Sequence, residues 1–144
     1  MKKFLALNNE LFSTEGLLTI RKATDMKGYK IVVMYSNQLV GFDVFYRNRE
    51  EREKDFNNIK NLLTNENFLV INEELISTKN LRKVSMDNTE RDYKINFTYD
   101  LDERKEFRTM PKEIINKTFS INVYYNNDKE LRDKDFKYIK MKLL

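Results

Sequence analysis

Two stretches of this chain repeat one another, and the repeat limits the possible folds more than any other feature. Residues 4–35 and 68–99 align without a gap, and 12 of the 32 aligned positions are identical. The shared positions include the motif Asn-x-Glu-Leu-x-Ser-Thr, which begins at Asn8 and again at Asn72. A charged segment from Glu50 to Phe56 matches a second one from Glu130 to Phe136, with about 16 extra residues in the second half. The chain therefore resembles a tandem duplication.

The length of the repeat predicts how the two halves are organised. A unit of about 60 residues buries only about 60% of its chain surface, whereas a body of about 150 residues buries nearly 70%. We therefore expect two copies, residues 1–64 and 65–144, packed as one compact body of 144 residues. The second copy carries an insertion at about 101–117.

Short runs of apolar and β-prone residues predict about four strands in each copy. The expected strands are residues 3–7, 17–22, 29–35 and 39–46 in the first copy, and 68–71, 81–86, 93–99 and 118–125 in the second. The Asn-x-Glu-Leu-x-Ser-Thr motif is typical of a turn or an irregular edge, because its side chains bond their own backbone. Gly28 is suited to a positive φ in a loop.

The faces of the predicted third strands differ between the copies. Residues 93–100 alternate apolar and polar, which is typical of an antiparallel strand with one wet face. In the first copy Val32 and Met34 replace Asn96 and Thr98, so that sheet has an apolar outer face. Either the second copy or a protein partner should cover this face.

Each copy ends in a predicted amphipathic helix. Asn48 with Glu51, and Asn127 with Glu130, have the spacing of an N-cap and its capping-box partner. Two sets of residues fall on one helical face: Arg52, Phe56, Ile59 and Leu63, and Arg132, Phe136, Ile139 and Leu143. Phe56 and Phe136 are the expected core anchors. The fold class is therefore α+β, a small antiparallel sheet followed by one helix, twice.

The composition argues against most catalysis. The chain has no His and no Cys, which excludes imidazole and thiolate chemistry. It also lacks the glycine-rich motifs that cradle nucleotide phosphates. We therefore expect no enzyme activity, no cofactor and no metal. The alternative is a hard cation held by Asp100, Asp102 and Glu103, for which a solvated turn is the simpler explanation.

Charge and hydropathy bear on location and on partners. The net charge is +4 and no segment holds a block of one sign, so the strong basic surface of a phosphate-backbone binder is missing. The apolar run at residues 4–7 is too short for a signal peptide, and no run has the length of a membrane span. The sequence therefore predicts a cytoplasmic protein.

Several residues are candidates for contact with a partner. The insertion carries Arg104, Lys105, Arg108 and Lys112, and it is either a contact site or a lid over one end of the second sheet. Phe45 and Tyr124 are expected on outer faces, where they either stack a nucleobase or pack between the copies. With Val32 and Met34, these residues make up the predicted partner-binding set.

The leading hypothesis is a non-enzymatic protein-binding module that acts by stoichiometric occlusion of a partner. The bias toward Lys, Asn and Ile suits an AT-rich genome, and the pattern resembles many short proteins of low-GC bacteria and their phages. By that analogy the partner is a larger nucleic-acid-processing complex, and the protein is an inhibitor from a phage or mobile element, such as an anti-CRISPR protein. The alternative is an accessory protein that binds RNA or single-stranded DNA. The sequence leaves the oligomeric state open.

Overall fold

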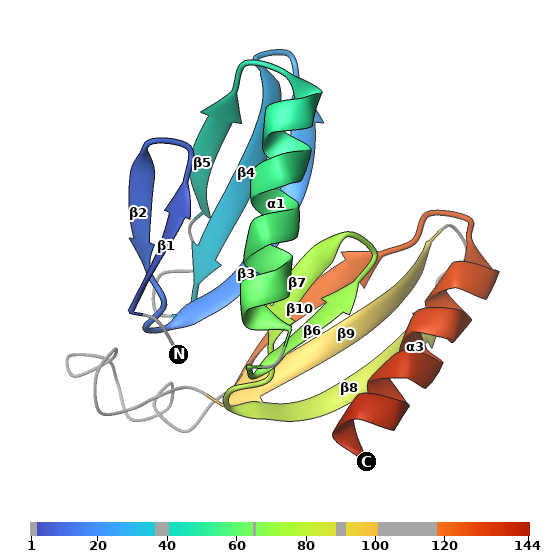
Figure 1. Cartoon of the computed structure of the whole chain (residues 1–144). Coiled ribbons are helices and arrows are strands. Elements are labelled where there is room, and N and C mark those ends of the chain that lie inside the picture. Colours follow the sequence, from blue (N-terminus) through green and yellow to red (C-terminus); the bar gives the residue numbers. More distant parts are fainter. Residues whose placement is uncertain (1–2, 37–40, 65, 89–91, 101–117) are drawn as a thin grey trace. The chain divides into compact units, whose positions relative to one another are not determined.

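A computed structural model of the chain describes residues 3–36, 41–64, 66–88, 92–100 and 118–144 (Figure 1). It confirms an α+β protein, with antiparallel sheets and two helices. The contacts divide the chain into two compact units, Met1–Thr78 and Lys79–Leu144. Within these described ranges, the order of five strands followed by one helix occurs twice along the sequence.

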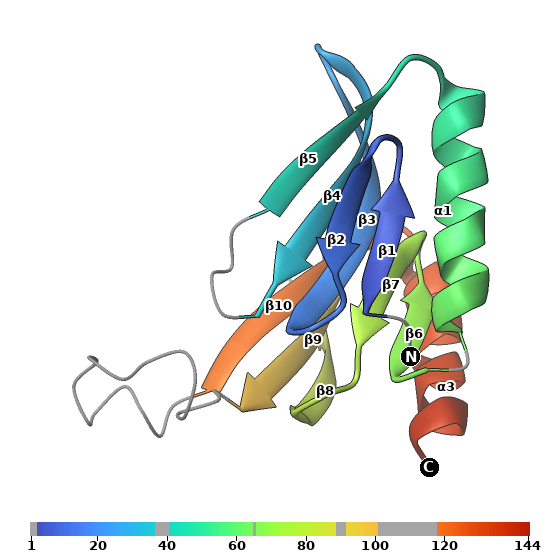
Figure 2. The same cartoon turned by 60° about the vertical axis from the view of Figure 1, so that its left-hand side comes forward.

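In the first unit, the residues that the structure describes form seven strands and one helix. The strands are β1 (Phe4–Leu7), β2 (Glu10–Ser13), β3 (Leu17–Asp25), β4 (Gly28–Tyr35), β5 (Gly41–Tyr46), β6 (Phe68–Ile71) and β7 (Glu74–Ser77), and the helix is α1 (Arg49–Leu63). β1 and β2 form a two-stranded sheet, and the other five form an antiparallel sheet in the order β5-β4-β3-β7-β6. Figure 2 shows β5 at an edge of that larger sheet.

The described residues of the second unit form three strands and one helix. The strands β8 (Leu81–Asn88), β9 (Tyr93–Asp100) and β10 (Thr118–Tyr124) form an antiparallel sheet in the order β10-β9-β8, followed by α3 (Lys129–Leu143). The pairing of β8 with β9 has the register of β3 with β4, sixty-four residues on. Both pairings contain an irregularity at the same place, after Leu17 and after Leu81.

The number of strands differs from the sequence-based expectation. The Asn-x-Glu-Leu-x-Ser-Thr motif is not simply a turn, because its Glu-Leu-x-Ser part forms β2 in one case and β7 in the other. Only two residues make each turn, and Asn8, Asn72 and Glu73 have the positive φ angles that tight hairpins use. Gly28 also has a positive φ, as predicted.

The hairpin of β6 and β7 lies in the first unit. β7 pairs with β3, so the five-stranded sheet contains strands from both halves of the sequence repeat. The pairing sets Ile20 opposite Leu75 and Arg21 opposite Glu74. The division between the compact units therefore falls after Thr78, beyond the repeat boundary at residue 64.

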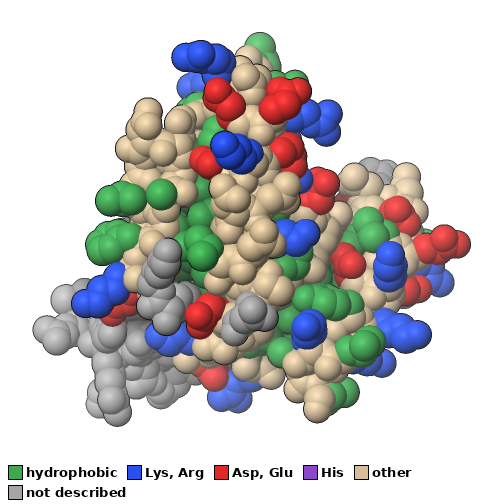
Figure 3. Space-filling view, viewed as in Figure 1, with side chains coloured by type: hydrophobic (Ala, Val, Ile, Leu, Met, Phe, Trp, Pro, Cys, Tyr) green, Lys and Arg blue, Asp and Glu red, His purple; other side chains and the backbone are tan. Residues whose placement is uncertain are grey.

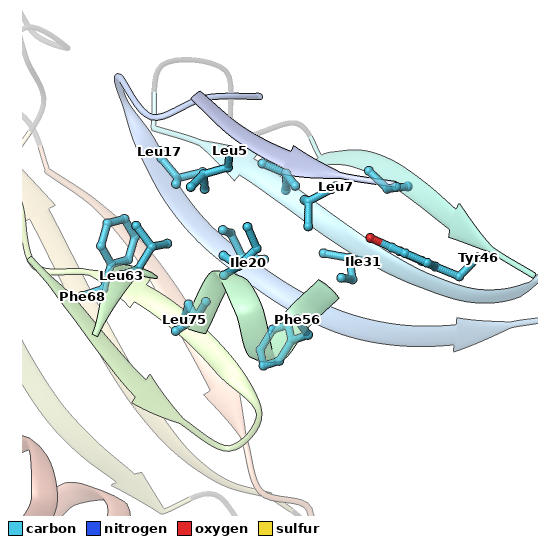
Figure 4. Close-up of a cluster of buried hydrophobic side chains, with 13 residues drawn as sticks. Leu5, Leu7, Leu17, Ile20, Ile31, Tyr46, Phe56, Leu63, Phe68 and Leu75 are labelled. Carbon is cyan, nitrogen blue, oxygen red and sulfur yellow. The ribbon is translucent and has the colours of Figure 1, made fainter. Parts of the chain in front are cut away.

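The core of the first unit lies between the large sheet on one side and α1 with the β1–β2 hairpin on the other (Figure 4). It contains the predicted inner residues of β4 and the predicted apolar face of α1. Its members include Leu5 and Leu7 from β1, Ile20 from β3, Ile31 and Val33 from β4, Phe56, Ile59 and Leu63 from α1, and Phe68 and Leu75 from the second hairpin. Phe56 is a core anchor, as predicted.

The core of the second unit is less completely closed. Ile95, Phe97 and Tyr99 of β9 and Ile139 of α3 are buried. However, Phe136 is only partly buried, although its position matches that of Phe56. The predicted second anchor is therefore weaker than the first.

The helix caps agree with the sequence in one of two cases. The side chain of Asn48 accepts a hydrogen bond from the backbone N–H of Glu51, at 2.9 Å, as predicted for α1. The cap of α3 is Asp128, not Asn127, because the Asp128 carboxylate accepts from the Leu131 N–H at 3.0 Å. The predicted Asn127 cap was wrong by one residue. A carboxylate there also interacts favourably with the helix dipole.

Candidate partner-binding surface

The edge strand β5 presents two exposed aromatic side chains. β5 pairs with β4, and no second strand pairs with it among the residues that the structure describes. Val44 and Tyr46 are buried in the core, whereas Phe42 is 45% exposed and Phe45 is 41% exposed. At one end of this edge the backbone carbonyl of Phe45 accepts a hydrogen bond from the Asn8 side-chain amide at 2.9 Å. Over the rest of its length, a strand edge flanked by apolar side chains is a typical site for pairing with the strand of another protein.

Phe42 belongs to a small aromatic group. Its ring centroid lies 5.9 Å from that of Tyr35, nearly edge to face, and 6.4 Å from that of Phe12. The Tyr35 hydroxyl donates to the backbone carbonyl of Ser13 at 2.7 Å, which ties β4 to β2. Phe42 is therefore held on one side while much of its ring remains accessible.

Phe45 lies beside a balanced group of charges. The ammonium of Lys30 is 5.8 Å from the centroid of the Phe45 ring. The same ammonium contacts the carboxylates of Asp25, at 2.8 Å, and Asp43, at 3.1 Å. These hydrogen bonds raise the pKa of Lys30, and the bond from Lys30 lowers the pKa of Asp25. Because two carboxylates surround one ammonium, this surface disfavours a phosphate.

The other predicted residues of the first sheet lie deeper. Val32 is buried and Met34 is partly buried. The absence of a side chain at Gly41 permits part of this packing, because a Cβ atom at that position would lie 2.7 Å from Cγ1 of Val32. The accessible apolar surface near β5 is therefore that of Phe42 and Phe45, and not the Val32 and Met34 strip that the sequence suggested.

Tyr124 lies in the second unit, on β10, and its side chain is exposed. It stands at the end of a row of polar contacts on the outer face of that sheet, as the alternation of β9 predicts. The Asn96 amide donates to the Asn122 side chain at 2.9 Å, and the hydroxyls of Thr98 and Ser120 are 3.1 Å apart. The Asn122 amide donates to the Tyr124 hydroxyl at 3.4 Å.

The remaining predicted contacts cannot be placed on this surface. Arg104, Lys105, Arg108 and Lys112 lie outside the described residues, as does most of the acidic cluster. Asp100, the first residue of that cluster, accepts a hydrogen bond from Nε of Arg82 at 2.6 Å. Within the described ranges no three acidic side chains gather as metal ligands would.

The Ser-Thr pair of the first motif bonds the backbone. The Ser13 hydroxyl oxygen accepts from the Glu15 N–H at 3.1 Å, and the Thr14 hydroxyl donates to the Lys3 carbonyl at 3.2 Å. These contacts match the local role that the sequence suggested for this pair. In this role the two hydroxyls close the end of the β1–β2 hairpin.

Sequence reasoning missed Phe42 as a surface residue. The alternation of β5 placed Phe42 with Val44 and Tyr46 in the inward set, and the buried pair fits that pattern. The signal that could have indicated its exposure was its position near the start of an edge strand.

No described helix has the length and apolar character needed to cross a membrane. Comparisons of this chain with protein-family models, with curated proteins and with solved structures found no match.

Proposed function

We propose that this chain is a non-enzymatic protein-binding module that occludes its partner stoichiometrically, by accepting an extended strand of the partner along β5. The observation that carries the proposal is the pair of exposed phenylalanines, Phe42 and Phe45, on a sheet edge with which no second strand pairs in the described part of the chain. Backbone hydrogen bonds along β5 supply affinity, and the two rings, on opposite faces of the strand, supply specificity. A phage or mobile-element inhibitor of a defence complex, such as an anti-CRISPR protein, would be one instance of this mode.

A tandem duplication is part of the same proposal. Identical residues at 12 of 32 aligned positions support it, as do the equal registers and the equally placed irregularities of β3 with β4 and β8 with β9. Each half also contains a tyrosine that bonds an aspartate of the following helix. Tyr46 donates to Asp55 at 2.9 Å, and Tyr125 donates to Asp135 at 2.8 Å.

The test of the β5 proposal is capture of partners with matched variants. Proteins from a host lysate are captured on the wild-type chain, on a Phe42→Ser/Phe45→Ser variant, and on a Leu62→Lys control. Leu62 is an exposed apolar residue of α1. We expect the double variant to lose the captured protein, with affinity at least about 30-fold weaker, as for aromatic hot spots worth about 2 kcal/mol or more. The control should keep wild-type affinity.

Amide hydrogen exchange then locates the contact. Binding of the captured partner should slow exchange along β5, because strand addition gives its free N–H groups new acceptors. Charge reversal at Arg104, Lys105, Arg108 and Lys112 tests in parallel whether the insertion contributes. Equal capture by the double variant and the wild type would refute the β5 surface. Binding to RNA or single-stranded DNA that weakens steeply with salt would favour the nucleic-acid alternative instead.

A further inference from the structure

The β6–β7 hairpin shows how an edge of this fold is completed. β7 runs antiparallel to β3, with Thr19 opposite Ile76, Ile20 opposite Leu75 and Arg21 opposite Glu74. In this position Leu75 has no exposed surface and Phe68 is only 8% exposed. Both belong to the same cluster as Ile20 and Leu63 (Figure 4). The hairpin therefore extends the sheet and also closes the core beneath α1.

The same hairpin occurs a second time without such a strand partner. β1 and β2 pair in the register of β6 and β7, and in the described part of the chain β2 pairs with no strand other than β1. Leu11, which corresponds to Leu75, is 72% exposed, and Phe4, which corresponds to Phe68, is 55% exposed. The opposite face of the hairpin, with Leu5 and Leu7, is buried in the core of the first unit. The hairpin is thus anchored, and it presents its other face outward.

The matching edge is that of β8. β8 pairs with β9 as β3 pairs with β4 in the first unit. However, β3 also pairs with β7, whereas in the described residues β9 is the only strand partner of β8. Val84 corresponds to Ile20 and is only partly buried, whereas Ile20 is fully buried. Leu143 of α3 is 44% exposed, whereas its counterpart Leu63 is 1% exposed. Met86, on the same face of β8 as Val84, is also exposed.

The outward face of the β1–β2 hairpin and the edge of β8 are complementary to each other. One has β2, whose only strand partner in the described residues is β1, and two outward apolar side chains, Phe4 and Leu11. The other has β8, whose only strand partner in those residues is β9, together with the partly buried Val84 and the exposed Met86 and Leu143. Figure 3 shows hydrophobic side chains exposed over the β1–β2 hairpin and over the lower part of α3.

We propose that a second copy of this chain docks its β1–β2 hairpin on the β8 edge of the first copy. The internal β7–β3 register predicts the contact, with Phe12 opposite Lys83, Leu11 opposite Val84 and Glu10 opposite Ser85. Leu11 and Phe4 then cover Val84 and Leu143, as Leu75 and Phe68 cover Ile20 and Leu63. This inference rests on the tandem duplication proposed above.

The docking requires no segment to leave its own core. Leu5 and Leu7 remain packed in their own unit, because the hairpin uses only its outward face and its β2 edge for the new contact. The sheet of the second unit would gain two strands and reach the order of the five-stranded sheet. Since each copy carries one hairpin and one β8 edge, the contact is head to tail, and it produces rings or open chains of copies.

The first test is a mixing experiment. Leu11→Lys blocks the hairpin, and Met86→Lys/Leu143→Lys blocks the β8 edge. All three side chains are exposed in the single chain, so both variants should fold, and circular dichroism checks this. Sedimentation should show concentration-dependent assembly of the wild type and of a Met26→Lys control. Each blocked variant alone should remain at 17.5 kDa. A mixture of the two variants should form dimers and nothing larger. The Leu11→Lys chain keeps only its β8 edge, and the other variant keeps only its hairpin, so each pair can make one contact.

The second test is cross-linking, which is specific because the chain contains no cysteine. A Leu11→Cys chain mixed with a Val84→Cys chain should form a disulfide-linked heterodimer under mild oxidation. Leu11→Cys mixed with Ser85→Cys is the control, because a shift of one residue places the side chain on the other face of the strand. A wild type that stays monomeric up to roughly 1 mM, the range of very weak association, would overturn the proposal. So would assembly that both blocked variants retain, or equal cross-linking of the two cysteine pairs.

Discussion

Glu74 is a carboxylic acid in an environment that favours its neutral form. It lies in β7 opposite Arg21 of β3. Burial raises the pKa of Glu74 to about 7, although the charge of Arg21 acts in the opposite direction. The folded protein therefore holds this proton more tightly than the unfolded chain, in which the pKa is near its ordinary value of 4.5.

This proton makes the free energy of unfolding depend on pH. Between pH 4.5 and about 7 the folded state binds more protons than the unfolded state, so its stability falls as the pH rises. The loss should reach up to about 3 kcal/mol, at 1.36 kcal/mol for each unit of pKa shift. Glu74→Gln should remove most of this dependence, and the exposed neighbour Glu73→Gln should not. Urea denaturation across this range measures it, and equal pH profiles for Glu74→Gln and the wild type would contradict the prediction.

Two buried arginines show what a sequence pattern reveals and what it does not. The spacing correctly placed Arg52 and Arg132 on the inward faces of their helices. Nη1 of Arg52 donates to the Ala23 carbonyl at 2.8 Å, and its guanidinium lies over the Tyr29 ring. Nη1 of Arg132 donates to the Asp87 carbonyl at 3.0 Å, and its guanidinium lies over the Tyr93 ring. These partners are distant in sequence, so periodicity could not identify them. The sequence contained one signal for these contacts, because a Tyr and an Arg recur at equivalent positions of the two copies.

The hairpins show why short strands are difficult to predict. β2 and β7 have four residues each, too few for alternation to outweigh the Asn, Ser and Thr residues around them. The longer β4 and β9 were predicted closely. The pairing of β7 with β3 depends on contacts between segments that are distant in sequence. Local secondary-structure propensity gives no information about such contacts.

The turn between β6 and β7 can be improved. Asn72 and Glu73 have φ values of 42° and 63°, and a side chain such as that of glutamate is unfavourable in this region. Glu73→Gly creates Asn-Gly, the preferred pair for a two-residue hairpin. We expect stabilisation by about 1 kcal/mol. The lost contact of Glu73 with Lys22, at 3.5 Å, contributes little because Glu73 is exposed. Thermal denaturation measures the effect, with Glu73→Ala, which keeps the strain, as the control. Equal or lower stability of Glu73→Gly would contradict the expectation.

The boundaries of the sequence repeat and of the compact units differ. The repeat places the boundary after residue 64, whereas the structure divides the chain between Thr78 and Lys79. The displaced segment is the β6–β7 hairpin, which carries Phe68 and Leu75 into the core of the first unit. The repeat itself could not reveal this, because aligned residues indicate equivalent positions and not which copy they pack against.

The exposure of the proposed partner-binding residues could be inferred only in part from the sequence. Exposure of Phe45 and Tyr124 follows from strand alternation, and the structure places both on accessible surfaces. Burial of Val32 was not evident, since its strand alternation indicated only that it faces away from α1. Phe42 was assigned to the inward set because strand alternation indicates which face of the sheet a residue lies on. It does not indicate how far along the strand that face is covered by other elements.

Fragments test which boundary governs folding. A fragment of residues 1–78 should unfold cooperatively, because it retains the hairpin beside Ile20 and Leu63. A fragment of residues 1–64 loses Phe68 and Leu75 from the core, and truncation of such buried side chains costs about 2–5 kcal/mol each. We expect it to be largely unfolded. Denaturant titration followed by circular dichroism compares the two, and equal stability would show that the hairpin is dispensable.

The pairing of β7 with β3 also sets an order of events during synthesis. While the ribosome is still adding residues 65–77, a nascent chain that already contains α1 lacks the strand that covers Ile20. The first unit can reach its final stability only after Ser77 has left the exit tunnel. Until then the edge of β3 that β7 will occupy is unpaired, and unpaired strand edges favour association with other chains. The speed of translation over this interval should therefore influence the yield of folded protein.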